Sequence, residues 1–283
     1  MEKIESSAQF GGLVKEFKKN HKGAQSNCFF LPAEVEDMAG RGKLYYEQKP
    51  EGLYFLVTEE SCARLYYYVD KDAQVSMDFG KEDLVKNAVI LDYVFRGDEE
   101  TALKKGGYEK WLEKGFIPYK RYRRMECAKG DFHPPKDYSE AQHRFRAEKA
   151  KPEDYREISS LWKKSLDVYS TFLLEEQEFT ESCEKGEIIA MRLSDGTVFA
   201  VAMAIKKGKN AFLQHLSVEP SLRGNGMGKA MFCAVVTFAY EEYGVEKANF
   251  WVDEKNSRAI GMYIKGGFTD DGTVSRQFIL EKK

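Results

Sequence analysis

Residues 216–229, LSVEPSLRGNGMGK, decide how the rest of the chain is interpreted. They begin at the end of an alternating apolar stretch and end where a helical apolar pattern starts, so they predict a strand, a glycine-rich turn and a helix. Glycines let a backbone approach a ligand closely, and the N–H groups at a helix start attract anions. We interpret the turn as a pyrophosphate cradle. Its residues are Arg223, Gly224, Asn225, Gly226, Met227, Gly228 and Lys229.

The elements expected around this turn form one continuous pattern in the second half of the chain. Three strands precede the turn, and Asp195-Gly196 is a strong hairpin signal between the first two. The expected order is β-αα-βββ-α-β-α-β(β), at residues 145–150, 152–169, 175–183, 187–193, 197–207, 210–218, 227–243, 247–252, 256–264 and beyond 268. This order predicts the α/β class, with a central mixed, mostly antiparallel sheet flanked by helices.

The length of 283 residues predicts two domains. Residues 1–130 are expected to form a smaller N-terminal α/β domain. Its expected strands and helix are residues 53–58, 64–70, 88–95 and 98–114. Glycine, the Pro134-Pro135 pair and many charges mark residues 131–144 as a linker, which leaves residues 145–283 as the second domain.

The composition excludes several classes of protein. The 44 basic and 46 acidic side chains nearly cancel to a net charge of -2, so no basic field indicates nucleic acid binding. No run of about 18 apolar residues predicts a membrane span, and the N-terminus lacks the apolar core of a signal peptide. The five cysteines stand singly, without a C-x-x-C pair, so neither a metal site nor a disulfide is expected. We therefore expect a cytoplasmic protein without a metal.

Two signatures make the second half resemble the GNAT (GCN5-related) N-acetyltransferases. The first is the Arg-x-x-Gly-x-Gly turn at residues 223–228, directly after the strand that ends at residues 216–220. The second is NSRAIGMYIKGGF at residues 256–268, which is similar to the family's second signature. Both occur in the family's order and on the expected elements, and the resemblance covers roughly residues 145–280.

The resemblance implies a GNAT fold and acetyl-CoA as cosubstrate, with its pyrophosphate in the cradle. Main-chain groups of Leu216 and Val218 would bind the pantetheine arm and the acetyl carbonyl. Asn256 and Ser257 would contact the cofactor at the start of the following helix. An ordinary N-cap is the other role expected at that position, and both roles can hold together.

The resemblance also implies an acid that protonates the departing CoA thiolate, and Tyr263 occupies the family's tyrosine position. The alternative is a tyrosine that only packs against the cofactor. For the base, His215 has a suitable pKa range, but neighbouring Gln214 stands where many members carry an acid, and adjacent strand residues face opposite sides. A structural histidine, the carboxylates Glu187 and Glu219, and a water relay therefore remain open.

The first half contains a weak internal echo of the second. WLEKGF at residues 111–116 parallels YIKGGF at residues 263–268, so the first half is interpreted as a degenerate GNAT-like repeat. The alternative is that helix–Gly–Phe–strand junctions are common in α/β proteins. The first half has no Arg-x-x-Gly-x-Gly turn, and Trp111 replaces the tyrosine, so one cofactor site per chain is expected.

Taken together, the residues and the resemblance predict an N-acetyltransferase. It would transfer acetyl from acetyl-CoA directly to a primary amine of a small molecule or peptide. Trp162, Tyr169 and Phe172 would line the acceptor groove unless they pack in the core. The alternative is a non-catalytic acyl-CoA-binding or regulatory module that retains the fold. The sequence indicates neither the acceptor nor the oligomeric state.

Overall fold

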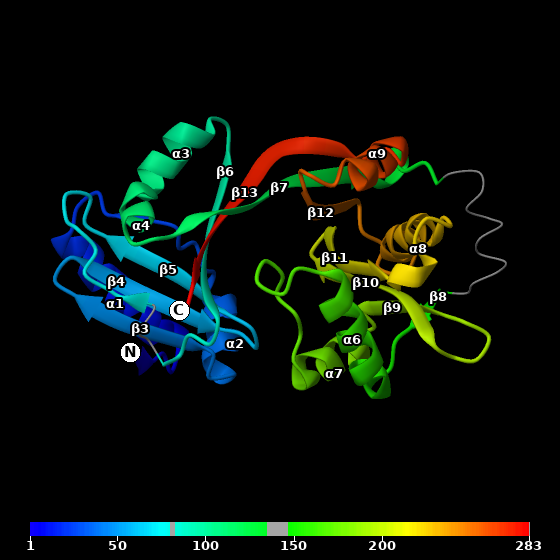
Figure 1. Cartoon of the computed structure of the whole chain (residues 1–283), viewed down its shortest axis with the longest axis horizontal. Coiled ribbons are helices and arrows are strands. Elements are labelled where there is room, and N and C mark those ends of the chain that lie inside the picture. The colour runs from blue at the N-terminus through cyan, green and yellow to red at the C-terminus, as the bar shows by residue number, and fades with distance from the viewer. Residues whose placement is uncertain (80–82, 135–146, 283) are drawn as a thin grey trace. The chain divides into compact units, whose positions relative to one another are not determined.

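A computed structural model describes residues 1–79, 83–134 and 147–282, which form two compact units (Figure 1). Unit 1 comprises Met1–Arg121 and the C-terminal segment from Thr273, and unit 2 comprises Tyr122–Gly272. This division differs from the predicted boundaries at residues 130 and 145. Residues 135–144 of the predicted linker lie outside the described residues.

Strand pairing is the physical reason for this difference. Strand β7 (Ile117–Ala128) enters unit 2, where its residues 122–128 pair antiparallel with β12 (Lys247–Asp253). Strand β13 (Thr269–Glu281) enters unit 1, where its residues 273–281 pair antiparallel with β6 (Ala88–Arg96). Each unit therefore completes its sheet with a strand from the other half of the sequence.

Unit 2 is a mixed sheet covered by helices, as predicted. Its strand order is β7-β12-β11-β10-β9-β8. Neighbours run antiparallel except β11 and β12, which are parallel. The remaining bounds are β8 Ala147–Lys149, η3 Pro152–Asp154, α6 Tyr155–Ser165, α7 Glu176–Glu184, β9 Ile188–Arg192, β10 Val198–Lys207, β11 Asn210–Val218, η4 Pro220–Leu222, α8 Met227–Glu241 and α9 Ser257–Lys265.

Alternating side chains of β10 explain how the helices of unit 2 pack. Ala200, Ala202 and Ala204 belong to the core that contains α8, while Val201 and Met203 belong to the core under α6 and α7. Successive strand residues face opposite sides, so one apolar strand serves both layers. The small alanines let the long helix α8 approach the sheet on which its N-terminus is positioned.

Unit 1 repeats the same arrangement. Its strand order is β1-β3-β4-β5-β6-β13, and β5 and β6 form its parallel pair. The bounds are β1 Glu2–Lys3, α1 Ser7–Asn20, β2 Gln25–Ser26, α2 Pro32–Gly40, β3 Leu44–Lys49, β4 Gly52–Thr58, β5 Ala63–Val69, α3 Glu99–Gly106 and α4 Glu109–Glu113. The described residues between β5 and β6 contain no α-helix, whereas α8 occupies this place in unit 2.

The predicted echo between the halves has a common geometry. Gly115 and Gly267 have φ of 89° and 94°, which glycine adopts without strain. The N–H of Phe116 donates to Trp111 O at 3.0 Å, and the N–H of Phe268 donates to Tyr263 O at 3.1 Å. Both helix ends are thus built in the same way, which supports the repeat.

Candidate active site

The parallel pair of unit 2 separates partway along its length. Strand β11 pairs with β12 only from Asn210↔Lys247 to Phe212↔Asn249. Towards its end β11 carries a bulge opposite β10, because the register shifts between Val201 and Met203. His215 lies in this bulge with φ 57°, the one positive φ among the described non-glycine residues. Such bulges re-aim the backbone, and they are frequent beside functional sites.

The glycine-rich turn follows directly and begins α8. Gly224 and Gly226 have φ of 90° and 81°, and Gly226 is the N-cap without a side-chain hydrogen bond. The first helical N–H with an intrahelical partner is that of Ala230, which donates to Gly226 O at 3.0 Å. The N–H groups ahead of it point out of the helix at the positive end of its dipole.

The space around the turn fits a bound pyrophosphate. A Cβ added at Gly224 or Gly226 would meet no heavy atom within 4 Å, so the surface there is open. Residues 223–226 are exposed, while Lys229 is half-buried on the first turn of α8. The predicted cradle residues are thus brought together around one open helix start.

Arg223 holds the turn against its surroundings. Its Nε donates to the Val218 carbonyl at 3.0 Å, and its Nη2 donates to Ser165 Oγ at 2.9 Å. The Val218 carbonyl, predicted to face the cofactor, therefore already accepts one hydrogen bond. Leu216, in the bulge, has no partner residue on β10 in the strand register. These contacts tie the cradle to the end of β11.

Tyr263 lies in an aromatic cage on α9. Its ring centroid lies 4.5 Å from that of Phe250 and 4.6 Å from that of Phe232. The residue is 8% exposed. Burial raises the pKa of Tyr263 to about 12, so the hydroxyl stays protonated at neutral pH. Asn256 caps the same helix, because its Oδ1 accepts from the N–H of Ala259 at 3.2 Å.

His215 is buried and enclosed. Its Nδ1 is 3.1 Å from the sulfur of Met203, and its ring centroid is 5.0 Å from that of Trp162. Burial lowers the pKa of His215 to about 4, opposed by a hydrogen bond with the backbone of Phe172. Its imidazole is therefore neutral at pH 7 but only weakly basic. This surrounding favours a structural histidine over a base.

The predicted acceptor-lining residues divide into two kinds. Trp162 is fully buried, and its Nε1 donates to the His215 carbonyl at 3.1 Å, so it belongs to the core and holds the bulge. Phe172 is 47% exposed. Sequence reasoning missed the Trp162 contact, because a single indole on a helix gives no signal of the strand that it will meet.

A buried hydroxyl on β11 also escaped prediction. Ser217 is 2% exposed, and its Oγ has no hydrogen-bond partner among the described residues. An unpaired buried hydroxyl is costly, so such groups need an explanation. Ser217 lies between Leu216 and Val218, the residues expected to meet a cofactor.

The separated parallel strands, the bulge and the uncapped helix behind a glycine turn thus lie together around the end of β11. Residues 152–268 match the family model of the acetyltransferase (GNAT) family. Unit 2 thus contains a GNAT domain, and the acetyltransferases of this family generally use acetyl-CoA.

Solved structures with the same fold cover most or all of the chain. A tandem GNAT protein from the clavulanic acid biosynthesis pathway aligns with TM-score 0.56 and 12% identity, over 99% of this chain and 95% of that one. A GCN5-related N-acetyltransferase from Sphaerobacter thermophilus aligns with TM-score 0.55 and 13% identity, over 82% and 77%. The chain therefore has a tandem GNAT fold, and the predicted fold class is confirmed.

The similar curated proteins match over a short segment. Mycothiol acetyltransferase of Salinispora tropica is 34% identical over 53 residues, which is 19% of this chain and 17% of that protein. The mycothiol acetyltransferase of Salinispora arenicola matches to the same extent. The matched segment thus spans about a sixth of these relatives' length.

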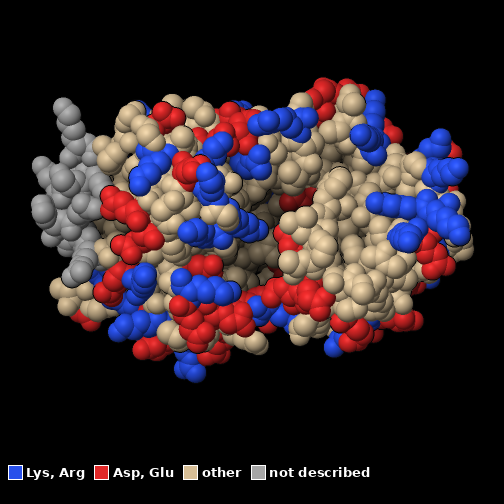
Figure 2. Space-filling view, turned by 180° about the vertical axis from the view of Figure 1, so that it is seen from behind, with Lys and Arg blue, Asp and Glu red and all other residues tan. Residues whose placement is uncertain are grey.

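Surface charge, membrane-spanning potential and metal-binding groups add three observations. Cationic and anionic side chains are interspersed on the face drawn in Figure 2. Within the described ranges, no helix combines the length and the apolar character needed to cross a bilayer. No group of three or more His, Cys, Asp or Glu side chains that could hold a metal ion occurs in the same residues.

Proposed function

We propose that unit 2 transfers acetyl from acetyl-CoA directly to a primary amine. The observation that carries this proposal is the open start of α8, where the N–H groups ahead of Ala230 have no intrahelical acceptor, beside the separated strands β11 and β12. Bound acetyl-CoA supplies an activated thioester there. The acceptor would be a small molecule or a peptide amine.

The chain's own residues have two tasks in this reaction. The cradle, residues 223–229, binds the pyrophosphate, and the main chain of Leu216 and Val218 orients the acyl arm. Tyr263 keeps its proton at neutral pH and donates it from its hydroxyl to the departing sulfur. Asn256 and Ser257 contact the cofactor from the start of α9.

The group that removes the proton from the attacking amine is less clearly defined by the structure than the acid. His215 is the predicted candidate, yet its enclosure by Trp162 and Met203 leaves a relay through water as the better-supported route. An acetyl thioester is already activated, so this route requires no strong protein base. Glu187 and Glu219 remain the carboxylates to test. No cysteine acts as a nucleophile in this mechanism.

The test is release of CoA thiol from acetyl-CoA in the presence of a panel of primary amines. All five cysteines are buried, so a thiol reagent detects the CoA product with little background signal from protein thiols. We expect release above the amine-free rate with at least one acceptor class. Binding of acetyl-CoA without release on any amine would favour the alternative, a non-catalytic acyl-CoA-binding module.

A further inference from the structure

In unit 1 the gap between the parallel strands is closed by the chain itself. Strand β5 pairs with β6 only at Ala63↔Val89 and Arg64↔Ile90, and β2 pairs with the far end of β5. The side chain of Asn27 then bridges the gap. Its Nδ2 donates to Leu65 O at 2.9 Å and to Asp92 O at 3.3 Å, and its Oδ1 accepts from the N–H of Tyr67 at 3.0 Å.

This bridge excludes the cofactor arrangement expected for unit 2. Asn27 is buried and uses the backbone groups that a pantetheine arm would need between the strands. No α-helix stands between β5 and β6 in the described residues, so a pyrophosphate would also lack its helix start. Any ligand of this unit must lie outside the closed gap.

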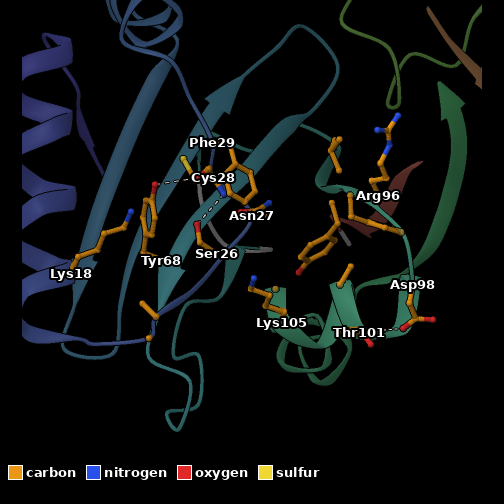
Figure 3. A pocket seen from close by; sticks show the side chains of 17 residues that line it. Lys18, Ser26, Asn27, Cys28, Phe29, Tyr68, Arg96, Asp98, Thr101 and Lys105 are labelled. Carbon is orange, nitrogen blue, oxygen red and sulfur yellow. Dashed lines mark hydrogen bonds between the residues drawn. The ribbon is translucent and has the colours of Figure 1, made fainter. Parts of the chain in front are cut away.

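A pocket lies over this bridge, entirely within unit 1. Its volume is about 740 Å³, within the range of sites that hold small organic molecules. Figure 3 shows Ser26 to Phe29 between two walls, with Lys18 and Tyr68 on one side and Arg96 and Lys105 on the other. The three hydrogen bonds of Asn27 fix its floor, so the pocket is preformed.

The charge of the pocket is predominantly positive. Lys18, Arg96 and Lys105 line it, against the single carboxylate of Asp98. That carboxylate is engaged, because its Oδ2 accepts from the N–H of Thr101 as the N-cap of α3 at 2.8 Å. Lys105 is exposed and has no ion-pair partner among the described residues. An anion would meet this ammonium without displacing an existing ion pair.

Aromatic surface completes the pocket. Phe29 lines it with 77% of its surface exposed. The ammonium of Lys18 lies 4.6 Å from the ring centroid of Tyr68, on the same wall of the pocket. An exposed phenyl ring in a pocket that cations also line is suited to stack on a planar ring that bears a negative group. The Cys28 thiol contributes no reactivity, because burial raises its pKa to about 11.

From these features we propose that unit 1 binds a small aromatic carboxylate in this pocket. The ring lies against Phe29, and the carboxylate accepts from Lys105. This is a second ligand site, separate from acetyl transfer in unit 2 and independent of it. In the degenerate repeat the gap between the parallel strands is thus closed, and the preformed anion pocket lies over the same strands.

The experiment titrates naphthalene-2-carboxylate into the full-length protein by calorimetry, with and without saturating acetyl-CoA. Naphthalene-2-carboxamide is the neutral probe of the same shape. We expect the carboxylate to bind with Kd below about 1 mM, and the amide about tenfold more weakly. Acetyl-CoA should leave the carboxylate Kd within about twofold.

Matched variants distinguish binding in this pocket from a general effect of surface charge. Lys105→Gln and Phe29→Ala should each weaken the carboxylate about fivefold. Lys104→Gln is the control, because Lys104 pairs with Glu100 at 2.7 Å on the same helix and does not line the pocket. It should change Kd by less than about twofold. Melting temperatures of all variants verify that each is folded.

Four results would overturn this site. They are no carboxylate binding at 1 mM, equal binding of carboxylate and amide, equal effects of Lys105→Gln and Lys104→Gln, or displacement by acetyl-CoA. Failure of acetyl-CoA to bind at all would count against the proposed function of unit 2 alone. Different observations would therefore overturn the carboxylate site of unit 1 and the acetyl transfer proposed for unit 2.

Discussion

At the scale of single residues, Tyr263 has two possible roles inside its aromatic cage: packing through its ring, or proton donation through its hydroxyl. Packing against Phe232 and Phe250 would keep a phenyl ring in place without its hydroxyl. Proton donation requires the hydroxyl itself. Because burial raises the pKa of Tyr263 to about 12, the proton is present throughout the neutral range.

Tyr263→Phe should therefore lower kcat by about a hundredfold or more, while the acetyl-CoA Kd stays within about twofold. Steady-state kinetic assays measure kcat, and calorimetry measures the acetyl-CoA Kd. Tyr155→Phe is the control, since Tyr155 also packs against a phenylalanine in unit 2, with ring centroids 5.4 Å apart. An unchanged kcat in Tyr263→Phe would reduce Tyr263 to a packing residue.

His215 predicts a pH dependence of stability. Its pKa is about 4 in the folded protein and 6.5 in the unfolded chain, so the unfolded chain binds more protons between these values. The stability that neutral His215 contributes is complete above pH 6.5 and is lost as pH falls towards 4. At pH 5 the loss is about 2 kcal/mol.

Urea unfolding of the wild type and His215→Gln at pH 7.5 and pH 5 measures this effect. The wild type should lose about 2 kcal/mol more than the variant over this range. All other titrating groups are shared, so the difference isolates the imidazole. Equal losses in the two proteins would mean that the fold does not lower the pKa of His215.

At the scale of elements, the sequence predicts an element best where the conformation of that element depends on its own residues. The glycine turn at 223–228 and the Asn256 cap were predictable, because positive φ and capping have residue-specific costs. The expected helix at 98–114 instead divides into α3 and α4 at Gly107, whose φ is 81°. The Gly106-Gly107 pair was the visible signal for that break.

Other features of the site depend on partners distant in sequence. Asn27 reads as an ordinary loop residue, yet its hydrogen bonds to Leu65 and Asp92 close the gap of unit 1. Trp162 reads as a helix residue, yet its indole holds the bulge at His215. No local pattern specifies such contacts, because they arise only when the strands have paired.

The N-terminal turn of α8 allows cofactor binding to be separated from folding. Gly228 has no positive φ, and a Cβ there would meet only Val218 Cγ2, at 3.9 Å. Gly228→Ala should leave the free energy of unfolding unchanged or raise it by up to about 1 kcal/mol. It should weaken acetyl-CoA by about tenfold or more, because its methyl group would stand where the pyrophosphate approaches the backbone.

Gly12→Ala on α1 is the matched control for that substitution. A Cβ at Gly12 meets nothing within 4 Å, and the helix lies in unit 1. It should give a similar change in unfolding free energy with no change in acetyl-CoA affinity. If Gly228→Ala binds acetyl-CoA as well as Gly12→Ala does, the cradle is elsewhere.

At the scale of the whole molecule, the sequence order and the folded units do not coincide. Each unit is completed by a strand that a division of the chain at its glycine- and proline-rich segment would assign to the other unit. The length of the chain led us to expect two domains, and the chain divides into two compact units. The boundaries of these units differ from those expected at the glycine- and proline-rich segment, because hydrogen bonding between distant strands decides them.

This exchange makes a sharp prediction for two fragments of the chain. Residues 122–272 retain every strand of unit 2, including the segment of β7 that pairs with β12 from Tyr122↔Asp253 to Ala128↔Lys247. Residues 145–283 lack that segment and keep the end of β13, whose Phe278 and Ile279 are buried within unit 1. An unpaired strand with apolar side chains is an aggregation site.

Fragment 122–272 should therefore be monomeric, unfold cooperatively and bind acetyl-CoA within about fivefold of the full chain. Fragment 145–283 should aggregate, or unfold without a cooperative transition. Size-exclusion chromatography, thermal unfolding and calorimetry on both fragments measure these properties. The opposite ranking would mean that residues 122–128 are dispensable for the GNAT domain, and that its fold is complete without a strand from the first half of the sequence.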